Sequence, residues 1–137
     1  MKRLTVLAAI FASVFATSTS AATMTLNCTM TDMHKSGGWI PKISIIEVDT
    51  TQKTIELLKP TAEEMGGKVK SSKLVRNTQD KMILRWILTG TKSKSNQRTP
   101  AFNYRALLHK NTGKVSVIAK PLGYGNDFRA KGDCKIS

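Results

Sequence analysis

The chain has 137 residues, of which 40% are hydrophobic and 23% are charged, and this length suits one domain with one hydrophobic core. Lysine and arginine outnumber aspartate and glutamate by 22 to 9, which gives a net charge of +13. The two cysteines and two histidines do not have the spacing of a zinc site, so we expect no metal and no other cofactor.

The N-terminal segment predicts export. Two basic residues precede the uncharged apolar run Leu4–Ala16, and small residues, Ser20 and Ala22, fit the −3 and −1 positions of a signal-peptidase site. As a helix the apolar run covers about 20 Å, which is short of the ~30 Å hydrocarbon core of a membrane. We therefore expect residues 1–22 to be a cleaved signal peptide. Residues 23–137 should form a single β-domain without a transmembrane segment, periplasmic or secreted by a bacterium.

Beyond this segment, short stretches show the two-residue alternation or the β-branched composition of strands, with turn residues between them. In chain order, the sequence predicts strands at 24–30, 39–48, 54–58, 69–76, 82–89, 101–109, 115–120 and 128–136. Only Lys59–Gly67 has helical character, for one turn at most. The polar run Gly90–Thr99 is expected to be a loop with no residue to bury.

Eight strands joined by short connections favour an antiparallel meander. Closing such a meander into a barrel removes its edges and makes the first and last strands neighbours. Cys28 lies in the first predicted strand and Cys134 in the last, and exported cysteine pairs form disulfides. We therefore expect an all-β, single-domain, eight-stranded barrel closed by a Cys28–Cys134 disulfide, with a two-sheet β-sandwich as the alternative. Trp39 and Trp86 are expected to fill the core or a barrel end.

Positive charge is concentrated in the second half of the chain. Residues 23–80 hold 8 basic and 7 acidic side chains, whereas residues 81–137 hold 12 basic and 2 acidic ones. Since the second half of a meander is contiguous in space, one side of the molecule should attract polyanions. The candidate contacts are Lys92, Lys94, Arg98, Arg105, Arg129 and Lys131.

The partners expected from this charge are an anionic glycan, lipopolysaccharide or an anionic membrane surface, bound by a monomer. Nucleic acid is disfavoured because the aromatic residues of the basic half do not follow a ribonucleoprotein pattern for base stacking. A purely solubilising role for the lysines is the alternative interpretation.

No catalytic motif is present, and we expect a protein that is not an enzyme. His34 and His109 could form the acid–base pair of a small secreted ribonuclease. Nothing in the sequence brings these two residues together, so this function is a remote alternative.

Within Phe102–Lys135, a strand, the hairpin Asn111-Thr112-Gly113, a second strand and Gly132-Asp133-Cys134 follow in order. This order resembles small exported bacterial β-barrel proteins of unknown function, and the architecture is similar to that of periplasmic lysozyme inhibitors. The resemblance implies a barrel and, as the alternative function, inhibition of an exogenous hydrolase. Because lysozymes are usually basic, the positive charge of this chain opposes such an association. The main hypothesis is an exported binding or envelope-associated module with a basic face.

Overall fold

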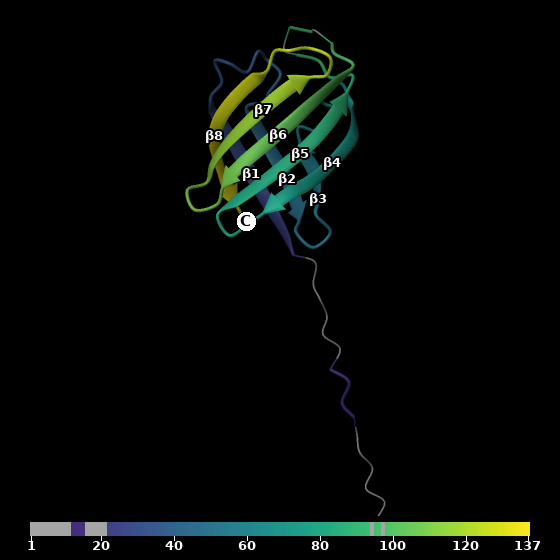
Figure 1. Ribbon diagram of the computed structural model, residues 1–137, viewed down its shortest axis with the longest axis vertical. Helices are drawn as coiled ribbons and strands as arrows, with labels where there is room; N and C mark the ends of the chain where they lie inside the picture. The colour runs from purple at the N-terminus through teal and green to yellow at the C-terminus, as the bar shows by residue number, and fades with distance from the viewer. Residues whose placement is uncertain (1–11, 16–21, 94, 97) are drawn as a thin grey trace, which may run out of the picture.

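The computed structural model describes residues 12–15, 22–93, 95–96 and 98–137. Figure 1 shows the strands wound into a barrel. The strands are β1 (Thr23–Asp32), β2 (Ile43–Asp49), β3 (Thr54–Lys59), β4 (Lys68–Asn77), β5 (Lys81–Thr89), β6 (Ala101–His109), β7 (Lys114–Pro121) and β8 (Phe128–Ile136). Over the described ranges no residue is helical, which confirms the all-β prediction. Accordingly, no helix in that part of the chain is long and apolar enough to cross a membrane.

The strands form one antiparallel sheet in the order β3-β2-β1-β8-β7-β6-β5-β4. A single sheet of eight strands excludes the two-sheet sandwich. The first and last strands are neighbours, as predicted, and Cys28 lies directly opposite Cys134. These two residues form the expected disulfide.

The barrel is nearly closed, and its opening lies between β3 and β4. In place of a ladder, Leu74 N donates a hydrogen bond to Lys53 O (3.0 Å) and Ser72 Oγ donates to Ile55 O (3.1 Å). Strand β4 carries two register shifts against β5. Such bulges bend and twist a strand, which limits how far β4 can run along β3.

The interior of the barrel is filled by side chains. In β5, Met82, Leu84, Trp86 and Leu88 are buried, whereas the residues between them face outward. A cavity of about 20 Å³ remains inside the barrel, which is room for roughly one water molecule. The side chains that line it therefore leave no space there for a larger molecule.

Two details of the sequence prediction were wrong. The second strand begins at Ile43 rather than Trp39, because Pro41 has no N–H for a ladder. Trp39 is buried all the same, with 8% of its surface exposed.

The run Gly90–Thr99 was expected to bury nothing, yet Thr91, Ser93 and Thr99 are buried. An isolated bridge between Lys92 and Arg98 folds this loop back on itself. Lys92 N also donates a hydrogen bond to Met65 O (3.0 Å). The folded loop thereby covers its own short polar side chains.

Candidate anion-binding face

Strand register places the outward residues of β4–β8 in rows that cross the strands. One row consists of Lys73, Arg85, Arg105, Ile118 and Arg129, each directly opposite the next. A second row consists of Arg76, Ile83, Leu107, Ser116 and Lys131, and a third of Ile87, Asn103 and Lys120. We call the cations of these rows the cationic face: Lys73, Arg76, Arg85, Arg105, Lys120, Arg129 and Lys131. No acidic residue occurs in the three rows.

Three neighbouring cations of the first row form its centre. Lys73 lies opposite Arg85, and Arg85 lies opposite Arg105. Directly opposed side chains on neighbouring strands have Cβ atoms about 4.5–5.5 Å apart, and like charges at that position are destabilising. Every ion pair among the described residues is formed by side chains other than these three. This triplet therefore has no counter-charge from the described part of the chain.

Two polar atoms beside the triplet are buried. In the described structure, neither Arg85 Nε nor Asn103 Oδ1 has a hydrogen-bond partner. A buried donor or acceptor without a partner costs roughly 1–3 kcal/mol.

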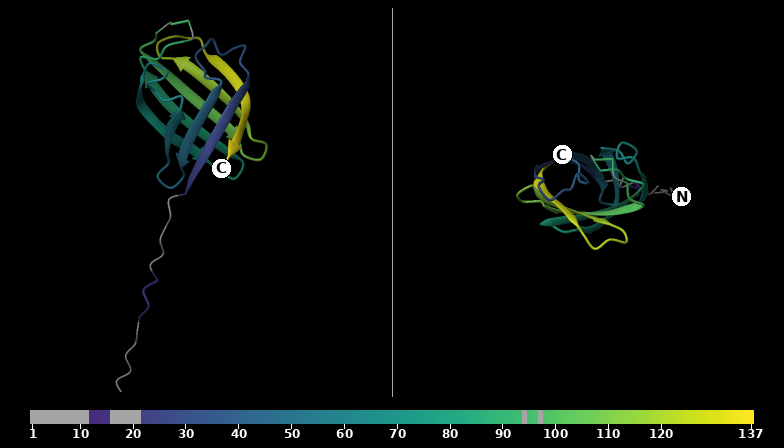
Figure 2. Two further views of the ribbon diagram at one scale, coloured as in Figure 1. Left: turned by 180° about the vertical axis from the view of Figure 1, so that it is seen from behind. Right: turned by 90° about the horizontal axis from the view of Figure 1, so that it is seen from above.

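Outward-facing acidic residues lie on β2 and β3. Glu47 of β2 and Glu56 of β3 face outward and lie directly opposite each other. In the sheet order, β2 is four strands from β6, which is half-way around an eight-stranded barrel. Figure 1 faces β5–β7, and Figure 2 (left) shows β1–β3 on the other side. Glu47 of β2 thus lies across the barrel from β6, whereas Glu56 belongs to β3, which borders β4 across the barrel opening.

Five of the six predicted contact residues belong to the described structure, and they fall into two groups. Arg105, Arg129 and Lys131 lie on the cationic face, where Arg129 Nη2 also donates to Asp127 Oδ2 (3.0 Å). Lys92 and Arg98 lie in the β5–β6 loop, at one end of the barrel. Lys94 lies outside the described residues.

Sequence reasoning missed Lys73 and Arg85, the other two members of the triplet. The signal for Arg85 was present, because it stands at an outward position of an otherwise apolar alternating strand. Lys73 could not be found in this way, because the bulges of β4 break its alternation. Register, which is a non-local property, brings these residues together.

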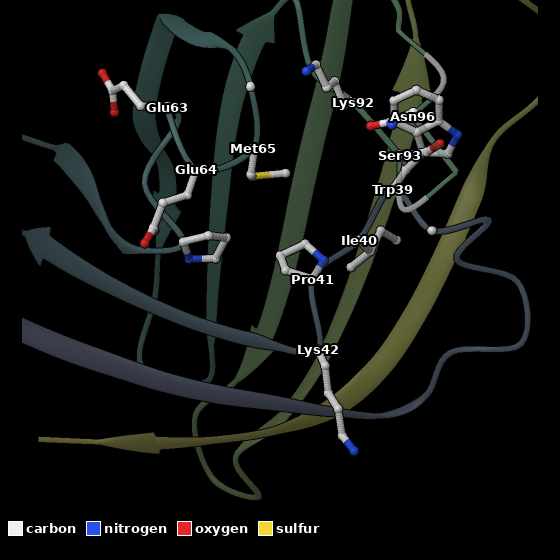
Figure 3. Close-up of a pocket in the computed structure, with 13 residues that line it drawn as sticks. Trp39, Ile40, Pro41, Lys42, Glu63, Glu64, Met65, Lys92, Ser93 and Asn96 are labelled. Atoms are coloured by element: carbon white, nitrogen blue, oxygen red, sulfur yellow. The ribbon is translucent and has the colours of Figure 1, made fainter.

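Two cavities lie at the barrel end that carries the β5–β6 loop. The first, of about 550 Å³, lies between the segment before β2, the β3–β4 connection and this loop. Figure 3 shows Glu63, Glu64 and Met65 on one side of this cavity, across from Trp39. Since Lys42 and Lys92 also line it, its charge is mixed, and it is no dedicated anion site.

The second cavity, of about 440 Å³, also has Trp39 in its wall. We call it the aromatic cleft; its lining residues are Trp39, Arg98, Thr99, Phe102, Pro121, Tyr124, Asn126 and Phe128. The two described cations of the β5–β6 loop therefore line different cavities, Lys92 the first and Arg98 the second.

The residues of the predicted acid–base pair are apart. His34 follows β1, where its Nδ1 and Asp32 Oδ1 are hydrogen-bonded, whereas His109 ends β6. Strands β8 and β7 lie between β1 and β6. Nor does the described part of the chain gather three or more His, Cys, Asp or Glu side chains in a metal-binding group.

Tyr104 connects the barrel core to the wall shared by the two cavities. Its hydroxyl donates a hydrogen bond to the Trp39 carbonyl oxygen (2.8 Å), and its side chain is fully buried. Burial raises the pKa of Tyr104 well above its ordinary value of 10.0, because a buried phenolate is poorly solvated.

This burial predicts a loss of stability in alkali. Above pH 10 the unfolded chain releases the Tyr104 proton while the folded chain retains it, so the free energy of unfolding falls by up to ~1.4 kcal/mol per pH unit. A Tyr104→Phe variant should lack this component, although it is less stable at pH 8 by about 1 kcal/mol because the hydrogen bond is lost. Urea unfolding of both proteins at pH 8 and pH 11 measures the difference. Parallel losses in the two proteins would contradict the prediction.

Comparison with known proteins finds no matching family, no related curated protein and no solved structure with a significant match. The function must therefore be inferred from the charge and shape of the barrel.

Proposed function

We propose that this protein is a non-enzymatic binding module for anionic polymers or surfaces outside the cytoplasm, with the cationic face as its contact surface. The observation that carries the proposal is the triplet Lys73, Arg85 and Arg105, whose like charges are directly opposed and which makes no ion pair with a described residue. Folding this arrangement costs free energy that a bound anion would recover. Guanidinium groups also bind carboxylate, sulfate and phosphate groups through paired hydrogen bonds.

The layout of the face favours an extended anion over a small one. Neighbouring strands are about 4.8 Å apart, so the first row spans roughly 19 Å from Lys73 to Arg129. A polymer lying across the strands would meet several cations at once, and each further contact is effectively intramolecular. A single small anion would reach only one or two of them.

The compartment is supported by the Cys28–Cys134 disulfide, because disulfides persist in oxidising compartments. Together with the predicted signal peptide, the disulfide favours the periplasm or the exterior of a bacterium. Acidic glycans, lipopolysaccharide and anionic lipid headgroups are the polyanions of that environment.

Charge reversal tests the proposal. An Arg85→Glu/Arg105→Glu variant should bind heparin at least about tenfold more weakly than the wild type, because two charge-assisted contacts become repulsive. The salt concentration that elutes it from a heparin column should fall, and the dependence of log K on log salt should become shallower by about one per lost contact.

A matched control separates a specific face from net charge alone. Lys42 and Lys59 are exposed, directly before β2 and at the end of β3, and neither belongs to the cationic face. A Lys42→Glu/Lys59→Glu variant has the same net charge as the Arg85/Arg105 double variant. We expect it to elute close to the wild type. Equal weakening in the two variants, with both shown to be folded by circular dichroism, would refute a localised binding face.

A further inference from the structure

The aromatic cleft has a rigid wall. The ring centroids of Trp39 and Phe102 are 4.6 Å apart, and Phe128 lies 6.3 Å from Trp39 and 6.0 Å from Phe102. The hydrogen bond from Tyr104 to the Trp39 backbone fixes this wall to the core of the barrel. Such a cleft keeps its shape before a ligand arrives, which lowers the cost of binding.

The aromatic cleft is also lined by an aromatic ring that is largely exposed to solvent. Tyr124 lies in the β7–β8 connection, and 66% of its surface is exposed. No other described large hydrophobic residue of the β-domain is as exposed. An exposed aromatic ring beside a preformed cavity is typical of a binding surface.

The polar groups of the cleft indicate what it could hold. The Thr99 hydroxyl already has a hydrogen-bond partner, because it donates to Ala101 O (3.2 Å). By contrast, the side chains of Arg98 and Asn126 make no hydrogen bond or ion pair to any residue that the structure describes. Arg98 can bind a carboxylate through two parallel N–H···O hydrogen bonds, and the Asn126 amide can both donate a hydrogen bond to a hydroxyl and accept one from it.

We propose that the aromatic cleft binds one uronic acid unit of an acidic glycan. The apolar face of the sugar ring would pack on Tyr124, its carboxylate would bind Arg98 and a hydroxyl would bind Asn126. A cavity of about 440 Å³ lies in the range of small-ligand pockets. This inference rests on the proposed function and narrows the anionic polymer to a carboxylated polysaccharide.

The position of the cleft supports this reading. Its lining residues Pro121 and Phe128 are next in sequence to Lys120 and Arg129 of the cationic face. A chain lying across β4–β8 can therefore place one sugar in the cleft while other units remain on the cations. Nucleic acid fits less well, because sequence-tolerant base stacking uses a series of exposed aromatic rings, and Trp39 and Phe102 are buried.

Trigalacturonic acid is a suitable probe, because it is too short to cover the cationic face. The chain has two tryptophans, Trp39 in the cleft wall and Trp86 inside the barrel, so their indole N–H signals in a ¹⁵N–¹H spectrum provide a site probe and an internal control. We expect saturable movement of the Trp39 signal, with the Trp86 signal nearly fixed. Absence of a saturable shift at Trp39 would overturn the proposal.

Variants identify the contacts by calorimetry. Tyr124→Ala and Arg98→Gln should each weaken trigalacturonate binding about tenfold or more, while Tyr124→Phe should stay within about threefold because the ring is retained. Neutral maltotriose should bind at least about tenfold more weakly, because it offers Arg98 no carboxylate. Unchanged binding in Tyr124→Ala, or equal affinity for maltotriose, would overturn the assignment.

The two proposals can fail separately. Arg85→Glu/Arg105→Glu should leave trigalacturonate affinity within about threefold, since these residues lie outside the cleft and exposed charges are screened over about 10 Å. Tyr124→Ala should lower the heparin elution salt much less than Arg85→Glu/Arg105→Glu does, because it removes one sugar contact and no cation. If the wild type is retained on heparin but does not bind trigalacturonate, only the proposal for the aromatic cleft is overturned. If the wild type binds trigalacturonate but the Arg85→Glu/Arg105→Glu variant elutes from heparin at the same salt concentration as the wild type, only the proposal for the cationic face is overturned.

Discussion

Replacing both Cys28 and Cys134 with alanine should lower the free energy of unfolding by about 4–5 kcal/mol. The disulfide joins residues 106 positions apart, and in the loop-entropy treatment a link of this span restricts the unfolded chain by that amount. Small domains are stable by only about 5–15 kcal/mol, so this loss is roughly a third or more of the free energy of unfolding. With a urea m-value of about 1–3 kcal/mol/M, the unfolding midpoint should fall by roughly 1.5–5 M.

Alanine is the suitable replacement because both cysteines are buried, with 3% and 7% of their surface exposed. The wild type unfolded in the presence of a reductant provides the control, and its midpoint should approach that of the double variant. A loss below about 1 kcal/mol would mean that the β1–β8 pairing holds the unlinked barrel together and that the disulfide is dispensable.

Local alternation was sufficient to predict most of the strands. β6 and β8 begin and end where the sequence predicts, because a proline, a glycine or a polar turn lies beside each end. Closure through β1 and β8 was also predicted, from the positions of the two cysteines. The opening between β3 and β4 was not predicted. A two-residue alternation shows which face of a strand is buried, but it does not show which neighbouring strand forms hydrogen bonds with it.

The residues of the cationic face were predicted only in part for the same reason. The charge count pointed to the second half of the chain, and Arg105 was named. Its neighbours Arg85 and Lys73 depend on register across three strands, and Lys73 belongs to the first half of the chain, which is nearly neutral in sum. The sequence analysis treated Trp39 as a core or barrel-end residue. It is one, but it also lines the aromatic cleft.

Gly132→Ala should be among the most damaging single substitutions in the barrel. A Cβ at this position would lie 2.1 Å from Thr29 O and 2.6 Å from Met30 Cα. Both atoms belong to the β1 backbone, which cannot rotate away as a side chain can. Overpacking of this kind typically costs 1–3 kcal/mol, and we expect about 3 kcal/mol or more here, because the two strands must separate beside the disulfide.

This close approach also explains physically why a glycine precedes Cys134 by two positions. Gly132 lies opposite Met30, where the β1–β8 register shifts, so β8 can approach β1 closely only without a side chain. Gly125→Ala is the matched control, since a Cβ there would meet nothing within 4 Å, and its effect should stay within about 0.5 kcal/mol. Urea unfolding of the two variants gives both values. Equal stability would show that the strands can separate at this point without loss, and the β1–β8 contact would then depend on the disulfide rather than on its backbone packing.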